Sequence, residues 1–198
     1  MGFPTPFFFS LRRQLMVEFE RIKLEKAYES VLVEAYKDYL KMPDGNTVVY
    51  DYLHHKTGGG AGALLVDDEE NTYLVRLYRN SINRASLEIP AGAYSKSGES
   101  GEVCAVREAE EETGLIPTKL YHISNMVSSI GTYDEMTDVF IGTGLKEGVR
   151  KLDPAEFIDV VKLTIDEAFE KVKDGTIVDS KTILALYAYR YMRAVGEI

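Results

Sequence analysis

Apolar and polar residues alternate over the first part of the chain with the period of a β-strand. Two alternating stretches, residues 31–36 and 48–52, flank the turn signal Pro-Asp-Gly-Asn at residues 43–46. Because alternation with a period of two is typical of strands and this polar run of a tight turn, we predict a hairpin here. The β pattern extends from residue 17 to about His55, which marks the end of a strand.

Between residues 99 and 115 the pattern changes to that of a helix. Ser100 is placed to cap this helix and Gly114 to end it, since a serine hydroxyl accepts from first-turn amides and glycine adopts the left-handed conformation at a helix end. Further strands are predicted at residues 63–66, 72–78, 121–128, 138–142 and 156–163, and further helices begin at Thr164 and about Ser180. Strands interleaved with a few helices predict an α/β fold with a mixed sheet.

A glycine-rich stretch at residues 58–62 precedes one of these strands. It lacks the following Lys and Ser/Thr of a phosphate-binding loop. We therefore expect a flexible entry to the strand.

Three glutamates of the predicted helix share one face. At 100° per residue, Glu108, Glu111 and Glu112 fall inside an arc of roughly 100°, whereas Glu110 points the other way. Like charges one turn apart repel by about 0.2–0.5 kcal/mol per pair, so this face requires positive charge unless it is simply a solvated acidic surface. Arg107 can hold Glu111, but one guanidinium cannot neutralise three carboxylates. Oxygen-only ligand sets suit Mg²⁺ or Mn²⁺.

Composition restricts the class of protein. With 198 residues, 45% of them hydrophobic and 28% charged, the chain suits one domain of ordinary size, with or without a small appendage. Its 23 basic and 32 acidic residues give a net charge of −9, which argues against nucleic acid or an anionic membrane as the main partner. A phosphorylated substrate must therefore meet local cations.

The cysteine content and the hydropathy indicate a compartment. Cys104 is the only cysteine, so no intrachain disulfide can form, and a reducing compartment is expected. No apolar run approaches the length of about 18 residues that a transmembrane helix needs. We expect a cytoplasmic protein.

Two motifs carry a family resemblance. Residues 107–115, which read Arg-Glu-Ala-Glu-Glu-Glu-Thr-Gly-Leu, resemble the second half of the Nudix box, and Glu99 stands at the family's spacing upstream. Residues 87–92, Leu-Glu-Ile-Pro-Ala-Gly, are similar to the strand and turn before the box in ADP-ribose pyrophosphatases. The family has Gly six residues before Glu99, where this chain has Ala93, which we interpret as one extra residue in the following loop. The resemblance implies the Nudix α/β/α sandwich with a mixed sheet.

The resemblance also implies a role for individual residues. The implied metal ligands are Glu108, Glu111, Glu112, Glu88 and the backbone carbonyl of Ala91 or a neighbour, and the implied metal is Mg²⁺ or Mn²⁺. The implied catalytic set is Glu135, Arg107 and Glu111, with Glu135 as general base or extra metal ligand on a loop at residues 129–137. Arg79 resembles an arginine that reaches a substrate phosphate, and Glu99 completes the substrate-binding set. Taken alone, Arg79, Glu88 and Glu135 also suit an ordinary surface.

The resemblance divides the chain into three parts. Residues 1–15 form an extension of unknown role, residues 16–56 an antiparallel β unit, and residues 57–198 the hydrolase domain. In the family a comparable β unit crosses to a second subunit, which implies a homodimer. By that resemblance Tyr50 stacks on the base of the substrate, although an amphipathic strand tyrosine is the plainer interpretation.

The implied reaction is hydrolysis of the pyrophosphate bond of ADP-ribose to AMP and ribose 5-phosphate. Another nucleoside diphosphate sugar is the first alternative, because the box recognises the pyrophosphate and says nothing about the base or the sugar. A non-catalytic nucleotide-sugar sensor on the same fold is the second alternative. Such a sensor is expected to lose one of the box acids, and this chain retains them.

Overall fold

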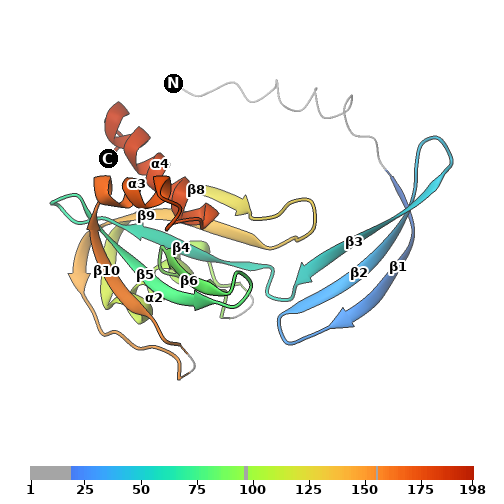
Figure 1. Cartoon of the computed structure of the whole chain (residues 1–198), viewed down its shortest axis with the longest axis horizontal. Coiled ribbons are helices and arrows are strands. Elements are labelled where there is room, and N and C mark those ends of the chain that lie inside the picture. The colour runs from blue at the N-terminus through green and yellow to red at the C-terminus, as the bar shows by residue number, and fades with distance from the viewer. Residues whose placement is uncertain (1–18, 96–97, 155) are drawn as a thin grey trace. The chain divides into compact units, whose positions relative to one another are not determined.

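The computed structural model describes residues 19–95, 98–154 and 156–198 (Figure 1). The chain divides into two compact units, the first ending at His54 and the second running from His55 to Ile198. The extension predicted at residues 1–15 lies outside the described residues.

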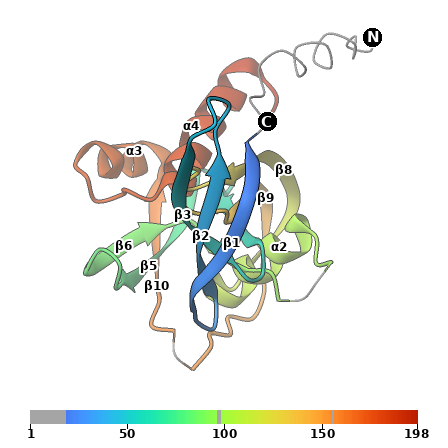
Figure 2. The same ribbon diagram turned by 90° about the vertical axis from the view of Figure 1, so that its right-hand side faces the viewer.

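The first unit is a three-stranded antiparallel sheet with the strand order β1-β2-β3 (Figure 2). Its strands are β1 (Glu20–Glu29), β2 (Val33–Lys41) and β3 (Thr47–His55). The predicted turn joins β2 to β3, with Gly45 at φ 89° and the Met42 amide donating to the Asn46 carbonyl at 2.7 Å. The hairpin is present as predicted, although β2 begins two residues later than the alternation indicated.

This sheet has almost no hydrophobic core of its own. None of the hydrophobic side chains at residues 19–54 is fully buried. Polar and aromatic contacts hold the strands instead: Arg21 donates two hydrogen bonds to Asp38 at 2.6 and 2.8 Å, and the rings of Tyr36 and Tyr52 stack with centroids 5.4 Å apart. A three-stranded sheet needs a covered apolar face for independent stability, and this sheet leaves large apolar side chains exposed.

The second unit contains two sheets. One has the order β7-β4-β9-β8, and the other has the order β10-β5-β6. The strands of the first are β4 (Gly59–Leu65), β7 (Ala91–Ala93), β8 (Leu115–Val127) and β9 (Met136–Glu147), and those of the second are β5 (Asn71–Arg79), β6 (Arg84–Glu88) and β10 (Asp159–Thr164). Strands β4 and β9 run parallel while the other pairs are antiparallel, so the sheet is mixed as predicted.

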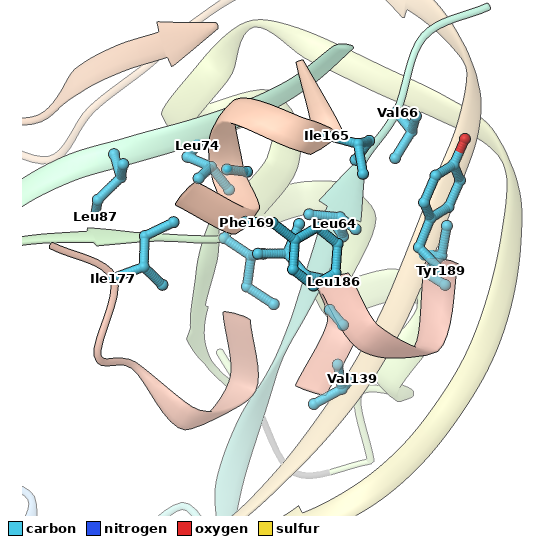
Figure 3. Close-up of a cluster of buried hydrophobic side chains, with 14 residues drawn as sticks. Leu64, Val66, Leu74, Leu87, Val139, Ile165, Phe169, Ile177, Leu186 and Tyr189 are labelled. Carbon is cyan, nitrogen blue, oxygen red and sulfur yellow. The ribbon is translucent and has the colours of Figure 1, made fainter. Parts of the chain in front are cut away.

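Helices cover both faces of the central sheet. They are α2 (Gly101–Thr113), α3 (Ile165–Lys173) and α4 (Ser180–Val195). Alternate side chains of β4 point to opposite faces: Ala63 and Leu65 pack with Cys104 and Ala105 of α2. Leu64 belongs to the cluster on the other face, with residues of α3 and α4 (Figure 3). The predicted α/β/α sandwich is confirmed, and in the described residues no helix is long and apolar enough to cross a membrane.

The prediction for the glycine-rich stretch is wrong. Residues 59–62 form the beginning of β4 at the buried centre of the sheet rather than a flexible entry. A Cβ on Gly60 would lie 2.0 Å from the carbonyl oxygen of Gly92, and one on Gly62 would lie 2.5 Å from Ala91 Cβ. Glycine is therefore required because β7 approaches this strand at backbone distance.

Candidate active site

Helix α2 presents its glutamates to the site because both of its ends are fixed. The Ser100 hydroxyl accepts from the Val103 amide at 3.3 Å, and Gly114 adopts φ 75° while its amide donates to the Glu110 carbonyl at 2.8 Å. Small buried residues, Cys104, Ala105 and Ala109, let the helix lie close on the sheet. Both predicted caps are confirmed.

The three glutamates of the acidic face differ in their surroundings. Glu108 and Glu112 are buried, with 9% and 5% of their surface exposed, whereas the side chain of Glu111 remains 40% exposed. Glu110 lies on another side of the helix, where its carboxylate accepts from the Val149 amide at 3.2 Å. Two of the three carboxylates of the predicted arc are therefore buried, and only Glu111 remains open to solvent.

Arg107 holds three carboxylates together. Its guanidinium donates to Glu99 at 3.1 Å, to Glu108 at 2.5 Å and to Glu111 at 3.0 Å. It also donates to the Ala93 carbonyl at 3.1 Å, which ties the helix to β7. The hydrogen bond from Arg107 lowers the pKa of Glu99 to about 2, and the bond to Glu99 in turn raises the pKa of Arg107.

Glu112 differs from its neighbours on the acidic face, because no described residue pairs with it as a cation. It accepts a hydrogen bond from the Ala91 amide at 2.9 Å, and within the described residues it forms no ion pair. Burial raises the pKa of Glu112 to about 8. Burial also raises the pKa of Glu108, although the hydrogen bond from Arg107 opposes that shift. These two carboxylates lie where a further positive charge would stabilise them.

Gly92 lies directly against the acidic face. A Cβ at this position would meet the carboxylate of Glu108 at 2.3 Å. The sequence left open how the turn before the helix accommodates its departure from the family pattern at Ala93. The structure assigns the close approach to Gly92.

A second cluster of charges surrounds Glu88 at the end of β6. Arg79 donates to both carboxylate oxygens at 2.8 and 2.7 Å, and the Lys181 ammonium donates at 2.5 Å. Burial alone would raise the pKa of Glu88, but the two cations outweigh it and lower the pKa to about 2. Lys181 was not among the predicted site residues. The one signal in the sequence was a lysine in the first turn of a helix, where a positive charge opposes the helix dipole.

A cavity of about 690 Å³ lies beside the Glu88 cluster, and among the described residues Glu108 of the acidic face contacts it only through the wall residue Gly92. Its wall includes Arg79, Glu88, Ala91, Glu135 and Lys181. Four of these five residues were predicted site residues, from β5, β6, β7 and the loop before β9. Tyr50 belongs to the first unit, on β3, where 53% of its surface is exposed.

His55 anchors the loop that carries Glu135. The His55 amide donates to the Asp134 carboxylate at 2.8 Å, and its Nε2 lies 3.8 Å from Glu135 Oε1. Its Nδ1 lies 2.9 Å from the Thr57 hydroxyl. The sequence marked this histidine only as the end of a strand, because nothing in the local pattern indicates a contact 79 residues away.

The carboxylates suit a hard divalent cation. In the described part of the chain no three acidic, histidine or cysteine side chains converge as a ready-made cage, since arginine and lysine occupy Glu88, Glu108 and Glu111. Mg²⁺ does not require such a cage, because it keeps waters and shares its shell with substrate phosphates. Glu112, buried and without a cation, together with neighbouring carboxylate and carbonyl oxygens, fits such an ion.

Comparison with known proteins assigns the family. The pattern of the NUDIX domain matches residues 56–186, and the chain therefore belongs to the NUDIX family. It is 32% identical to the methanol dehydrogenase activator of Bacillus methanolicus, with 91% of this chain and 97% of that protein aligned. It is also 32% identical to the ADP-ribose pyrophosphatase of Bacillus subtilis, with 89% and 94% aligned. A crystal structure of an ADP compounds hydrolase superimposes with a TM-score of 0.78 at 17% identity over 91% of this chain and 97% of that one, which shows a common fold.

Proposed function

We propose that the protein hydrolyses the pyrophosphate bond of ADP-ribose to AMP and ribose 5-phosphate. A relative that aligns over nearly its whole length carries that activity in its name. The cavity supports the proposal because Arg79 and Lys181 line it, and because its wall residues Ala91 and Gly92 lie directly against the carboxylates of Glu112 and Glu108.

We assign the metal to the acidic face. Glu108, Glu111, Glu112, Glu88 and the Ala91 carbonyl would hold Mg²⁺, or alternatively Mn²⁺. When bound, the cation neutralises phosphate oxygens and makes a bound water a better nucleophile. Arg107 keeps the carboxylates oriented through its three ion pairs, and Glu99 completes that arrangement.

The remaining residues act on the substrate and the water. The guanidinium of Arg79, on the cavity wall, suits bidentate binding of a phosphate. Glu135 lies on the same wall with 31% of its side chain exposed, which lets it accept the proton of the attacking water. Its position on a loop suits closure over the substrate.

The observation that carries the proposal is Glu112, a buried carboxylate without a cationic partner in the described residues. Its test is Glu112→Gln, assayed for AMP release from ADP-ribose with Mg²⁺. We expect a loss of at least about 10²-fold in kcat. The matched control is Glu110→Gln, on the same helix but bonded to the Val149 amide, which should keep wild-type activity. Full activity of the Glu112 variant would refute the assignment.

A substrate panel separates the alternatives. ADP-ribose, ADP-glucose, GDP-mannose and a deoxynucleoside triphosphate are compared at equal Mg²⁺ concentration. If the protein prefers another nucleoside diphosphate sugar, that compound replaces ADP-ribose as the proposed substrate, and the assignment of the site residues stays as it is. Binding of these compounds without hydrolysis would favour a sensor.

We also propose a homodimer that functions in the cytoplasm. Exposed apolar side chains on both faces of the first unit's sheet, including Ile22, Val49 and Tyr50, support a second copy as their partner. Tyr50 then remains a candidate to stack on the adenine base. A lone cysteine, buried under α2, is consistent with a reducing compartment.

A further inference from the structure

Lys181 lies in the first turn of α4, the end of a helix where a positive charge is least favourable. It is the second residue of α4, directly after the cap Asp179 and Ser180. A cation there opposes the positive end of the helix dipole. The cap Asp179 accepts from the Thr182 amide at 2.9 Å, and the Lys181 ammonium also donates to Asp179 at 2.9 Å. This ion pair offsets the unfavourable dipole interaction, but it does not explain why the ammonium also reaches Glu88.

Glu88 does not require Lys181 as its counter-ion. Arg79 already bonds both oxygens of that carboxylate, which is a complete bidentate pair. Lys181 adds a second cation at 2.5 Å, and only 14% of its side chain is exposed. The same ammonium pairs with Asp179 at 2.9 Å, so two carboxylates hold Lys181 at the cavity wall.

Both cations face the cavity. Arg79 and Lys181 line it together with Ala91 and Glu135. They come from β5 and from α4, 102 positions apart in the sequence, and they converge on one carboxylate. A diphosphate entering the cavity would therefore meet two cations already held side by side by Glu88.

We propose that Lys181 binds the diphosphate of the substrate jointly with Arg79, and that Glu88 holds both cations until a divalent cation replaces them on its carboxylate. This inference rests on the proposed site but requires no particular nucleoside or sugar. Metal binding and diphosphate binding then favour each other. A metal ion on Glu88 releases Arg79 and Lys181 for the diphosphate, and a diphosphate on these two cations releases the Glu88 carboxylate for the metal ion.

The first test measures binding without metal. Inorganic pyrophosphate is titrated calorimetrically into the metal-free protein in EDTA. In Glu88→Gln Arg79 loses its anionic partner and Lys181 keeps only Asp179, so we expect roughly tenfold tighter binding than in the wild type. In the double variant with Lys181→Met most of the gain should disappear. A lysine that serves only as a counter-ion predicts that the double variant keeps the gain, because Arg79 alone would supply it, and that result would overturn the inference.

The second test measures binding with metal. A non-cleavable methylene analogue of ADP-ribose is titrated in Mg²⁺, with folding checked by thermal melting. Lys181→Met should weaken binding by roughly tenfold and Lys181→Arg should restore part of it. Lys162→Met is the control, since Lys162 pairs with Asp67 at 3.1 Å and does not line the cavity.

The two proposals fail in different ways. If the wild type hydrolyses ADP-ribose and Lys181→Met keeps its affinity for the analogue, only the proposed role of the lysine is refuted. If the wild type leaves ADP-ribose intact and Lys181→Met loses pyrophosphate binding, ADP-ribose is refuted as the substrate while the role of the lysine stands.

Discussion

The backbone at Gly92 lies so close to the acidic face that one added carbon atom should disturb it. In Gly92→Ala the new Cβ would lie 2.3 Å from the carboxylate of Glu108, so either the carboxylate or β7 must shift. A displacement of about 1 Å at a catalytic group can cost on the order of 10² in rate. We expect a loss of that size in kcat on ADP-ribose, with the far-ultraviolet circular dichroism of the wild type. A variant within twofold of wild-type activity would show that Glu108 has room to move without cost.

Asp67, which lies outside the candidate active site, affects how the stability of the fold depends on pH. It accepts from the Asn71 amide at 2.8 Å, the Tyr73 hydroxyl at 3.0 Å and Lys162 at 3.1 Å. Burial raises its pKa, but these donors outweigh burial and lower the pKa to about 2. Because the folded-state pKa lies below that of the unfolded chain, the carboxylate stabilises the fold above about pH 4 and loses this contribution as the pH falls through about 2.

Asp67→Asn should therefore destabilise the protein by about 1 kcal/mol at pH 6, and the difference should shrink towards pH 2. Urea unfolding at a series of pH values measures it. A difference that stays constant over this range would mean that packing, not charge, accounts for the effect.

At the scale of single residues, the sequence predicted contacts within an element better than contacts between elements. The 100° spacing correctly separated Glu110 from Glu108, Glu111 and Glu112, because helix geometry alone fixes those directions. It could not indicate Lys181, whose partner Glu88 lies 93 residues away. Only the tertiary fold brings these two together.

Helix α2 connects metal binding to stability. Its buried Glu112 has no cationic partner in the described residues, so Mg²⁺ should raise the melting temperature of the wild type, as any ligand specific for the folded state does. At a hundredfold excess over Kd the gain is about 2.7 kcal/mol. Burial disfavours the ionised form of Glu112, so above about pH 8 the metal-free Glu112→Gln protein should melt higher than the metal-free wild type, and Mg²⁺ should stabilise it little. Equal Mg²⁺ shifts in both proteins would place the ion elsewhere.

Elements were predictable where local chemistry defines their ends. Ser100 and Gly114 delimit α2, and the Thr164 capping box begins α3 with both of its hydrogen bonds present. The glycine-rich beginning of β4 was misjudged, although the strand predicted at residues 63–66 is present, because glycine is a poor strand former in isolation. The reason for these glycines is the approach of β7, which lies about 30 residues further along the chain and leaves no local signal.

At the scale of the whole molecule, the sheet of the first unit gives rise to a prediction about the oligomeric state. Val49 and Leu53 lie on the same side of β3, because side chains separated by an even number of positions on a strand point to the same face. Of their surface, 50% and 40% are exposed. We expect exposed apolar groups of this kind, on a sheet with almost no core, to be buried against a second copy of the chain. Light scattering at micromolar concentration should therefore give twice the 22.3 kDa mass of one chain.

The double variant Val49→Lys/Leu53→Lys should shift that mass to a monomer, because two ammonium groups would have to be desolvated in the contact. Both side chains are exposed in the single chain, so the fold of the second unit should survive, as its unchanged thermal melting would show. Val149→Lys, an equally polar change at a site 75% exposed in the second unit, should leave the dimer intact. A wild-type monomer at this concentration would contradict the dimer, and the candidate role of Tyr50 in a shared pocket would lose its support.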